Sequence, residues 1–296
     1  MESSDAFYGF VPFEIREPLR QGMPFVFNSP HSGRFYPKAF LEQSRLDVRS
    51  IRRSEDYFVD ELFAGVVELG APLLLAHFPR AFLDVNREPY ELDPRMFEGS
   101  LPPFANVSSL RVAGGLGTVP RLVAENMEIY RRRIPADEAL RRIETIYRPY
   151  HASLQRLLSG TRAAFGYAVL IDCHSMPANV RMTGSTLRPD FIIGDRYGTS
   201  AALDITRAAA TLLKGMGYTV TRNKPYAGGF ITEHYGRPSH GLHAVQIEIN
   251  RGLYVDERTM EKTSGFDKLR ADITSFAATM MEIIAQSGEG RPLAAE

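Results

Sequence analysis

Short apolar stretches recur along the chain, and most have the length and the polar flanks of a β-strand. Between them, hydrophobic residues follow a helical period. The alternation of strands with helices predicts an α/β fold, a single domain with a mixed, mainly parallel sheet flanked by helices. The expected strands lie at 23–31, 71–79, 80–87, 167–175, 190–195, 218–225 and 243–250, and the expected helices at 38–69, about 120–160, 199–215 and 256–286.

Three features interrupt this regular pattern. The segment 88–119 is rich in Gly and Pro, so we expect it to run over the surface. Pro149 should bend or break the helical pattern around it, because proline has no N–H to donate. The final residues, about 288–296, are typical of a flexible tail.

The expected strand at 167–175 delivers three reactive side chains in succession. Successive side chains of a strand point to opposite faces, so Asp172 and His174 share one face while Cys173 takes the other. A free cysteine turned into a core behaves as a small apolar residue. We therefore expect the chemistry on the face of Asp172 and His174, with Cys173 buried and not acting as a nucleophile.

Other expected strands also carry polar residues toward their C-terminal ends. The stretch AVQIEIN alternates apolar residues with Glu248, AFLDVNR does the same with Asp84 and Asn86, and Pro30 ends the first strand just before His31. Ligands of open α/β sheets bind at the carboxyl ends of the strands. One crevice could collect His31, Asp84, Asn86, Arg87, Asp172, His174 and Glu248.

These residue types are those of a hydrolytic zinc site: imidazole and carboxylate ligands, an open position for water and a carboxylate base. Arg80 and Arg87 add guanidinium groups, whose planar donors suit a substrate carboxylate, although an ion pair with a neighbouring acid is an equal alternative for Arg80. No short HExxH motif is present. From the residues alone, two interpretations are equally supported: these side chains bind a metal, or they only hydrogen-bond to one another and to the backbone.

Composition narrows the class of protein. Lys plus Arg and Asp plus Glu both number 35 in 296 residues, and no long basic run is present, so no nucleic-acid partner is expected. No apolar stretch has the length of a membrane span, and the acidic N-terminus does not resemble a secretory leader. We expect a soluble, cytoplasmic protein that does not bind membranes. Its oligomeric state stays open.

Eight short motifs follow one another from about residue 24 to 255, namely NSPHSG, SEDYFVDELF, FPRAFLDVNRE, YRPYH, LIDCHSM, PDFIIGD, YAGGFITEHYGRP and LHAVQIEIN. In order and approximate spacing this succession resembles the N-formylglutamate amidohydrolase family. A remoter similarity links DVNR and DCHS to zinc carboxypeptidases and aspartoacylases. The resemblance implies a phosphorylase/hydrolase-like, zinc-exopeptidase-like fold, one zinc ion, hydrolysis of N-formyl-L-glutamate to formate and L-glutamate, and a place in histidine breakdown.

The resemblance also implies a role for individual residues. His31 and His174 resemble the histidine ligands, and Glu248 resembles the carboxylate that activates the water. Carboxypeptidases have a glutamate ligand three residues after the first histidine, but this chain has Arg34 there. The third ligand must come from elsewhere. Because the family shows an acid in SEDYF, Asp56 is the first choice and the neighbouring Glu55 the competing one.

Supporting roles follow from the same resemblance. Asn86 and Arg87 resemble the pair that holds the substrate carboxylate, with Arg80 as a possible second cation. Independently of the resemblance, His234 lies in a Gly-rich segment expected to form a loop, where it is a candidate substrate contact and a role in packing that loop is the alternative. Asp172 suits a role beside the ligands, since ligand histidines commonly donate their other N–H to a carboxylate. The roles of three more histidines stay open, namely His151, His240 and His243.

Two rival functions compete with this expectation. The same scaffold could hydrolyse another small N-acyl amino acid, such as an N-acetyl or N-succinyl compound, or a short peptide; the space beside the acyl group decides between them. A binding protein without catalysis is the other rival. The joint presence of His31, Asp56, His174 and Glu248 argues against that second reading.

Overall fold

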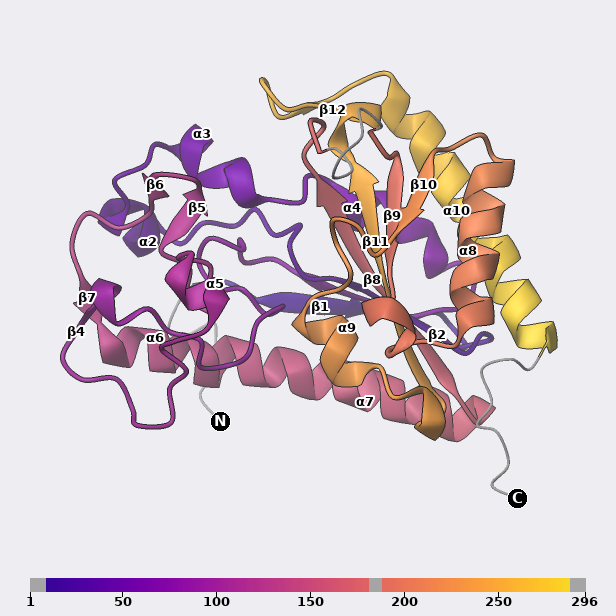
Figure 1. Cartoon of the computed structure of the whole chain (residues 1–296), viewed down its shortest axis with the longest axis horizontal. Coiled ribbons are helices and arrows are strands. Elements are labelled where there is room, and N and C mark those ends of the chain that lie inside the picture. The colour runs from indigo at the N-terminus through magenta and orange to yellow at the C-terminus, as the bar shows by residue number, and fades with distance from the viewer. Residues whose placement is uncertain (1–8, 181–187, 288–296) are drawn as a thin grey trace. The chain divides into compact units, whose positions relative to one another are not determined.

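The computed structural model describes residues 9–180 and 188–287 of the chain. It divides into two compact units (Figure 1). Unit 1 comprises Met1–Glu14, Pro30–Glu55 and Leu75–Ser153, and unit 2 comprises Ile15–Ser29, Asp56–Leu74 and Leu154–Glu296. That both belong to one catalytic domain over 1–296 stays a prediction. The tail expected at 288–296 lies outside the described residues.

Five strands of a seven-stranded sheet lie wholly in unit 2. β2 pairs in parallel with β8, β8 with β11, and β9 with β10, whereas β9 runs antiparallel to β11. The predicted mixed, mainly parallel α/β sheet is thus confirmed. In spatial order its strands are β1 (Phe13–Arg16), β3 (Leu73–Ala76), β2 (Phe25–Ser29), β8 (Ala168–Met176), β11 (Leu242–Asn250), β9 (Phe191–Gly194) and β10 (Val220–Arg222).

The central strand β8 is buried along its whole length. A strand covered on both faces needs apolar side chains on both, which explains the run AVLI at its start. The polar residues that follow, Asp172 and His174, are equally buried. Because a buried polar group destabilises the fold unless it is paired, both need partners at the C-terminal end of β8.

Helices flank this sheet. The helix α4 (Val59–Leu62) contacts β8, α8 (Leu203–Gly215) contacts β9 and β10, and α9 (Phe230–Tyr235) contacts β8 and β11. The long α10 (Gly265–Ser287) packs on α8 and α4, and Figure 1 shows α8 and α10 side by side. The predicted helix at 199–215 is confirmed as α8. The one predicted at 256–286 begins later, because β12 (Val255–Asp256) and β13 (Glu261–Lys262) pair first.

Unit 1 consists mainly of short elements. The continuous helix predicted over 38–69 is wrong: it is divided into short pieces, and Phe58 adopts a left-handed φ of 57° just before α4. The helix predicted from about 120 starts only at 136, after three short strands. The elements are α2 (Lys38–Gln43), α3 (Val48–Ile51), β4 (Phe97–Glu98), α5 (Leu110–Ala113), β5 (Leu122–Ala124), β6 (Met127–Glu128), β7 (Ile134–Pro135) and α6 (Ala136–Arg142). They are followed by α7 (Arg148–Phe165), of which residues 148–153 belong to unit 1 and the rest to unit 2.

Pro149 does not break its helix. The helical run continues from α6 into α7 through a π-helical segment, η4 (Ile143–Tyr147). Proline cannot donate to the carbonyl four residues earlier and its ring crowds that carbonyl, so a wider turn just before Pro149 relieves the conflict. The helix changes its winding at this point, and it does not end.

The segment 80–87 is not the predicted strand. Its backbone forms turns, and the Asp84 carboxylate accepts a hydrogen bond from the Asn86 N–H at 2.9 Å. A short acidic side chain that binds nearby backbone in this way competes with strand pairing. The Asp84 N–H itself donates to the Thr118 carbonyl at 2.8 Å. The apparent alternation of AFLDVN reflects burial in a turn, since residues 81–86 are all buried.

In the part of the chain that the structure describes, no helix combines the length and the apolar character needed to cross a membrane.

Candidate active site

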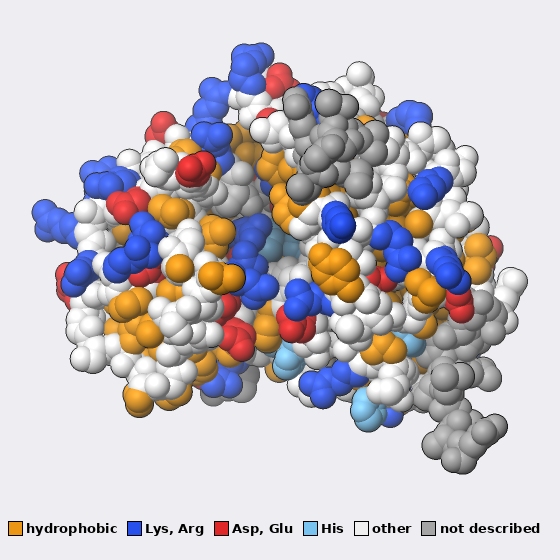
Figure 2. Space-filling view, viewed as in Figure 1, with side chains coloured by type: hydrophobic (Ala, Val, Ile, Leu, Met, Phe, Trp, Pro, Cys, Tyr) orange, Lys and Arg blue, Asp and Glu red, His pale blue; other side chains and the backbone are white. Residues whose placement is uncertain are grey.

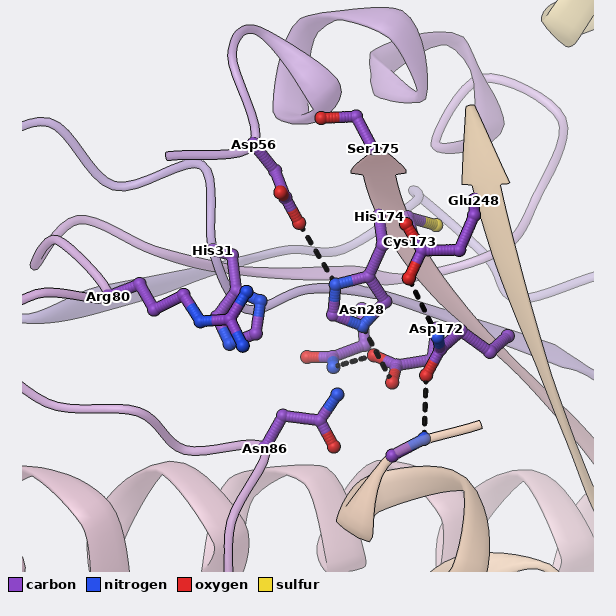
Figure 3. A network of polar contacts seen from close by, with 12 residues as sticks. Asn28, His31, Asp56, Arg80, Asn86, Asp172, Cys173, His174, Ser175 and Glu248 are labelled. Atoms are coloured by element: carbon purple, nitrogen blue, oxygen red, sulfur yellow. Dashed lines mark hydrogen bonds and ion pairs between the residues drawn. The ribbon is translucent and has the colours of Figure 1, made fainter. Parts of the chain in front are cut away.

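His174 lies between two carboxylates of unit 2. Its Nε2 is 2.9 Å from Asp172 Oδ2 and its Nδ1 is 3.0 Å from Asp56 Oδ2 (Figure 3). The other oxygen of Asp172 accepts a hydrogen bond from Asn28 Nδ2 at 2.7 Å, from the neighbouring strand β2. Asp172 and His174 therefore share one face of β8, as the alternation predicts, and Asp172 orients the His174 ring.

The surroundings of His174 favour positive charge. Burial disfavours the imidazolium, but the charge and hydrogen bond of Asp172, the hydrogen bond of Asp56 and the charge of Glu248 together raise the pKa of His174 well above its usual value. Three acidic groups thus act on one buried ring. Such a set suits a cation at this end of β8.

Asp56 and Glu55 have different partners. The Asp56 carboxylate contacts His174 through Oδ2 and accepts from Arg251 Nη2 through Oδ1 at 3.1 Å. Glu55, in unit 1, instead accepts two hydrogen bonds from Arg52, at 2.9 and 3.0 Å, and one from Tyr36 at 2.7 Å. Of the two acids left open by the sequence, Asp56 is the one beside His174.

Glu248 stands opposite His174 on the adjacent strand. In the parallel register of β11 with β8, Glu248 is the partner of His174, and Gln246 is the partner of Asp172. Gln246 Nε2 donates to Glu248 Oε1 at 2.8 Å, and Gln246 Oε1 accepts from the Gly229 N–H at 2.8 Å. Neighbouring strands lie about 4.8 Å apart, so this register aims the Glu248 carboxylate at the same space as the imidazole.

His31 belongs to a second buried pair, in unit 1. Its Nε2 lies 2.8 Å from Asp84 Oδ1. The chain can turn after His31 because residue 33 is glycine: a Cβ there would come 2.0 Å from the Phe78 carbonyl oxygen. His31 is thus paired with an acid at the same ring nitrogen as His174. The sequence motif NSPHSG gives no hint of that partner.

Asp84 organises the cations of the segment 80–87. Burial alone would raise the pKa of its carboxyl group, but the charges of Arg80, Arg87 and His31 hold that pKa well below its usual value. Arg80 Nε donates to Asp84 Oδ2 at 2.9 Å. The ion-pair role for Arg80 is therefore present in the structure, and its role toward substrate stays a prediction.

Arg87 is held mainly by backbone groups. Its Nε donates to the Leu116 carbonyl and its Nη1 to the Asn86 carbonyl, both at 2.8 Å, while Nη2 lies 3.5 Å from Asp84 Oδ2. Burial and the nearby Arg80 lower the pKa of Arg87 to about 10, against the raising effect of Asp84. These contacts fix the guanidinium in one orientation, next to the buried side chain of Asn86.

The helix that contains Pro149 anchors this turn. Tyr147 donates from its hydroxyl to the Arg87 carbonyl at 2.7 Å, and His151 Nε2 donates to the Val85 carbonyl at 2.8 Å. The two rings stack with centroids 4.2 Å apart. The motif YRPYH thereby acquires a physical role: the π-helical turn and Pro149 set Tyr147 and His151 against the carbonyls between Asp84 and Arg87.

We expect His151→Ala to lower both stability and activity. A buried carbonyl that loses its donor costs about 1–3 kcal/mol of the free energy of unfolding, and the turn bearing Asp84 and Asn86 loses an anchor. His77→Ala is the matched control, because His77 Nδ1 also donates to a carbonyl, that of Val11, at 3.0 Å. Urea unfolding and kcat/KM check this, and equal losses of kcat/KM in the two variants would contradict it.

The remaining histidines lie in different settings. His234, in α9, is exposed and stacks on Phe230 with centroids 5.0 Å apart. His240 is exposed in a short 3-10 turn, and His243 is buried in β11, where its Nδ1 accepts from the Ala202 N–H at 3.2 Å. The expected loop around His234 thus contains the short helix α9, and the substrate contact of His234 stays a prediction.

The predicted burial of Cys173 is confirmed. Burial, together with the charge of Asp172, raises the pKa of the thiol well above its usual value. Since the thiolate is the reactive form, this side chain is unsuited to nucleophilic attack.

The sequence did not predict three hydrogen-bond partners in this site. They are Asn28, which donates to Asp172, Arg251, which donates to Asp56, and Asp84, which pairs with His31. Asn28 and Arg251 have a signal that could have found them, since each lies at or just beyond the C-terminal end of a strand of the sheet. Arg251 follows EIN as Arg87 follows DVN. The pairing of Asp84 with His31 has no such local signal, because it joins residues 53 positions apart.

Comparison with known proteins places the chain among relatives. The model of the N-formylglutamate amidohydrolase family matches residues 23–255. The chain belongs to this family. A solved N-formylglutamate amidohydrolase from Ralstonia eutropha is 34% identical, with a TM-score of 0.88 over 94% of this chain and 100% of that chain. The family expected from the motifs is thereby confirmed, and the chain shares its fold with this relative.

Curated members of the N-formylglutamate amidohydrolase family are more distant in sequence. The N-formylglutamate deformylases of Pseudomonas aeruginosa and Pseudomonas putida are each 28% identical, over 83% and 79% of this chain and 87% and 83% of their own lengths. A structure from Agrobacterium tumefaciens, 18% identical with a TM-score of 0.65 over 96% of this chain and 98% of that chain, shares the fold.

Proposed function

We propose that this chain hydrolyses N-formyl-L-glutamate to formate and L-glutamate with the help of one bound zinc ion. Two curated relatives carry the name of this activity and match most of the chain. The observation that carries the proposal is the register that sets Glu248 opposite His174, with Asp56 and Asp172 at the two nitrogens of the ring. A hydrolytic metal site needs this combination of ligands and a separate carboxylate base.

We propose His31, Asp56 and His174 as the zinc ligands. All three are buried and each offers a ligand atom. The donor set fits zinc, because each histidine has a carboxylate at Nε2, Asp84 for His31 and Asp172 for His174. An N–H donated to that carboxylate leaves the Nδ1 lone pair for the ion and fixes the ring.

Chain connectivity supports including His31 with the ligands of unit 2. β2 ends at Ser29, two residues before His31, so their Cα atoms are at most about 7 Å apart. In the register of β2 with β8, Asn28 pairs with Asp172, two residues before His174. This connectivity supports the proposal of His31 as a ligand together with His174 and Asp56.

Glu248 and Gln246 have different proposed roles in the hydrolysis. When bound, zinc would polarise the formyl carbonyl and lower the pKa of a water molecule to about 7. Glu248 accepts one proton of the attacking water and passes it to the leaving nitrogen as the C–N bond breaks. The formic acid released then loses its own proton, which the free amine takes up, so the products are formate and L-glutamate. Gln246 orients the Glu248 carboxylate through its bond to Oε1.

Cationic and amide groups of unit 1 are proposed to hold the substrate. Asn86, Arg87 and Arg80 are assigned to the carboxylates of the glutamate part, since guanidinium donors match carboxylate oxygens. The backbone contacts of Arg87 support this role, because they hold the guanidinium in one orientation before substrate arrives. His234 is a further proposed contact. The assignment to histidine breakdown rests on the resemblance and the assignment to the cytoplasm on composition, and both stay predictions.

Formate release from N-formyl-L-glutamate tests the proposal. Zinc-loaded protein should release formate, and a chelator-treated sample should not until zinc is restored. N-acetyl-, N-succinyl-L-glutamate and a glutamyl dipeptide, assayed in parallel, report the acyl preference. If one of these compounds were turned over and N-formyl-L-glutamate were not, that compound would take its place as the proposed substrate. Full activity after verified removal of zinc would contradict the proposed zinc dependence.

The third ligand is tested by a pair of adjacent variants. Asp56→Ala should weaken zinc binding by more than the roughly 10–100-fold that loss of an outer partner of a ligand costs. Glu55→Ala is the control, since Glu55 pairs with Arg52 and Tyr36 and should keep zinc close to one ion per chain. Zinc content after dialysis at fixed free zinc decides. If Glu55→Ala lost zinc and Asp56→Ala kept it, Glu55 would be the third ligand in place of Asp56.

A further inference from the structure

A cavity of about 180 Å³ in unit 1 is lined mainly by arginine. Its lining residues carry six guanidinium groups but one carboxylate. Figure 2 shows many Lys and Arg side chains on the part of the surface over α3, β5 and β6. The lining residues are Arg45, Arg95, Met96, Arg121, Glu128, Tyr130, Arg131, Arg132 and Arg133. We call this the arginine cavity.

Two carboxylates account for three of these guanidinium groups. Glu128 accepts from Arg45 and from Arg121, both at 2.9 Å. The buried Asp93 accepts from Arg121 and from Arg95, both at 2.8 Å. Because Arg121 pairs with both acids, these five side chains form one row in which basic and acidic groups alternate. This row holds the paired arginines in place but compensates only two of the six positive charges.

The other three arginines are consecutive and exposed. Arg131 donates through Nε to the Ser44 carbonyl at 2.6 Å, a neutral partner. Within residues 9–180 and 188–287, no hydrogen bond or ion pair involves the side chain of Arg132 or Arg133. Adjacent positive charges around one cavity repel each other, and each would gain from an anion between them. The fold thus gathers four uncompensated cations around a hollow.

We propose that the arginine cavity binds a small polyanion with two or more phosphate or carboxylate groups. Guanidinium groups bind the oxygens of either group in a forked geometry. The volume greatly exceeds the about 10–15 Å³ needed for one water molecule. Four uncompensated charges call for more than one anionic group. The proposal is independent of the hydrolytic activity, because none of the residues proposed for catalysis lines this cavity.

Titration calorimetry at low ionic strength tests this with two probes, inorganic pyrophosphate and citrate. Each should bind saturably at one site, and the probe that binds more tightly identifies phosphate or carboxylate as the natural group. The double variant Arg132→Ala, Arg133→Ala should weaken binding at least tenfold. Both side chains are exposed, so folding should be retained, as thermal unfolding will show. Raising the salt from 50 to 200 mM should weaken binding as well.

The matched control is Arg156→Ala, which removes an exposed arginine of α7 that does not line the cavity. It should leave the affinity unchanged. Because both probes also bind metal ions, only the difference between the double variant and this control is attributed to the cavity. An equal affinity in the wild type and the double variant, an equal loss in both variants, or no saturable binding would overturn the proposal. Binding of duplex DNA without binding of either probe would overturn it too.

Discussion

Glu248→Gln should lower kcat for formate release by about 10²–10⁴-fold, the usual contribution of a general base, while zinc stays bound. Glutamine has the same shape and its carbonyl can still accept from Gln246, so the local packing of β11 is kept. What is lost is the ability to take a proton from water and return it to the leaving nitrogen. Initial rates together with zinc content measure the two effects separately.

Glu257→Gln provides the control for this change. Glu257 loses the same charge, and its carboxylate lies 3.6 Å from Arg251 Nη1 in an ion pair that does not involve His174. Its kcat should stay close to that of the wild type. If Glu248→Gln turned over at a near-normal rate with its zinc in place, Glu248 would not be the base.

His174→Ala should remove zinc and abolish formate release. The ring contacts both Asp56 and Asp172, so its loss removes a proposed ligand and the group that lies between two buried carboxylates. Zinc at about 100 times its Kd stabilises a native protein by roughly 2.7 kcal/mol, and the variant should lose that stabilisation. Thermal unfolding with and without zinc measures it.

Two further variants separate the metal role from simple burial. Asp172→Asn keeps the ring but weakens its outer partner, so zinc affinity should fall by about 10–100-fold. His243→Ala removes another buried histidine of the sheet, one that accepts from the Ala202 N–H, and should keep the zinc response. A zinc-dependent shift of the unfolding temperature that survives in His174→Ala would show that His174 is not a ligand.

Several parts of this protein could be predicted from local sequence. The alternation in LIDCHS and AVQIEIN correctly indicated two strands and the common face of Asp172 and His174, because the period of two is a property of the extended backbone. The same reasoning set Glu248 on the polar side of β11, and the register confirms it as the partner of His174. The motifs also identified the family, which the match over 23–255 confirms.

Other parts could not be predicted in this way. Residues 80–87 alternate like a strand, yet they form a turn, because the Asp84 carboxylate binds local backbone and because Arg142 and His151 bind the carbonyls of Phe82 and Val85. These anchors come from a helix about 60 residues later in the chain. Alternation reports which positions are buried, and a fully buried turn produces the same pattern as a buried strand.

Local pattern therefore determined the fold class, the family and the residue types of the site. The tertiary structure decided their partners: Asp56 rather than Glu55 beside His174, Asp84 beside His31, and Arg251 on the far side of Asp56. It also gathered the arginines of the cavity from separate segments. Backbone periodicity specifies where a side chain points within its own element, whereas a partner from a distant segment is set only when packing and charge pairing bring the segments together.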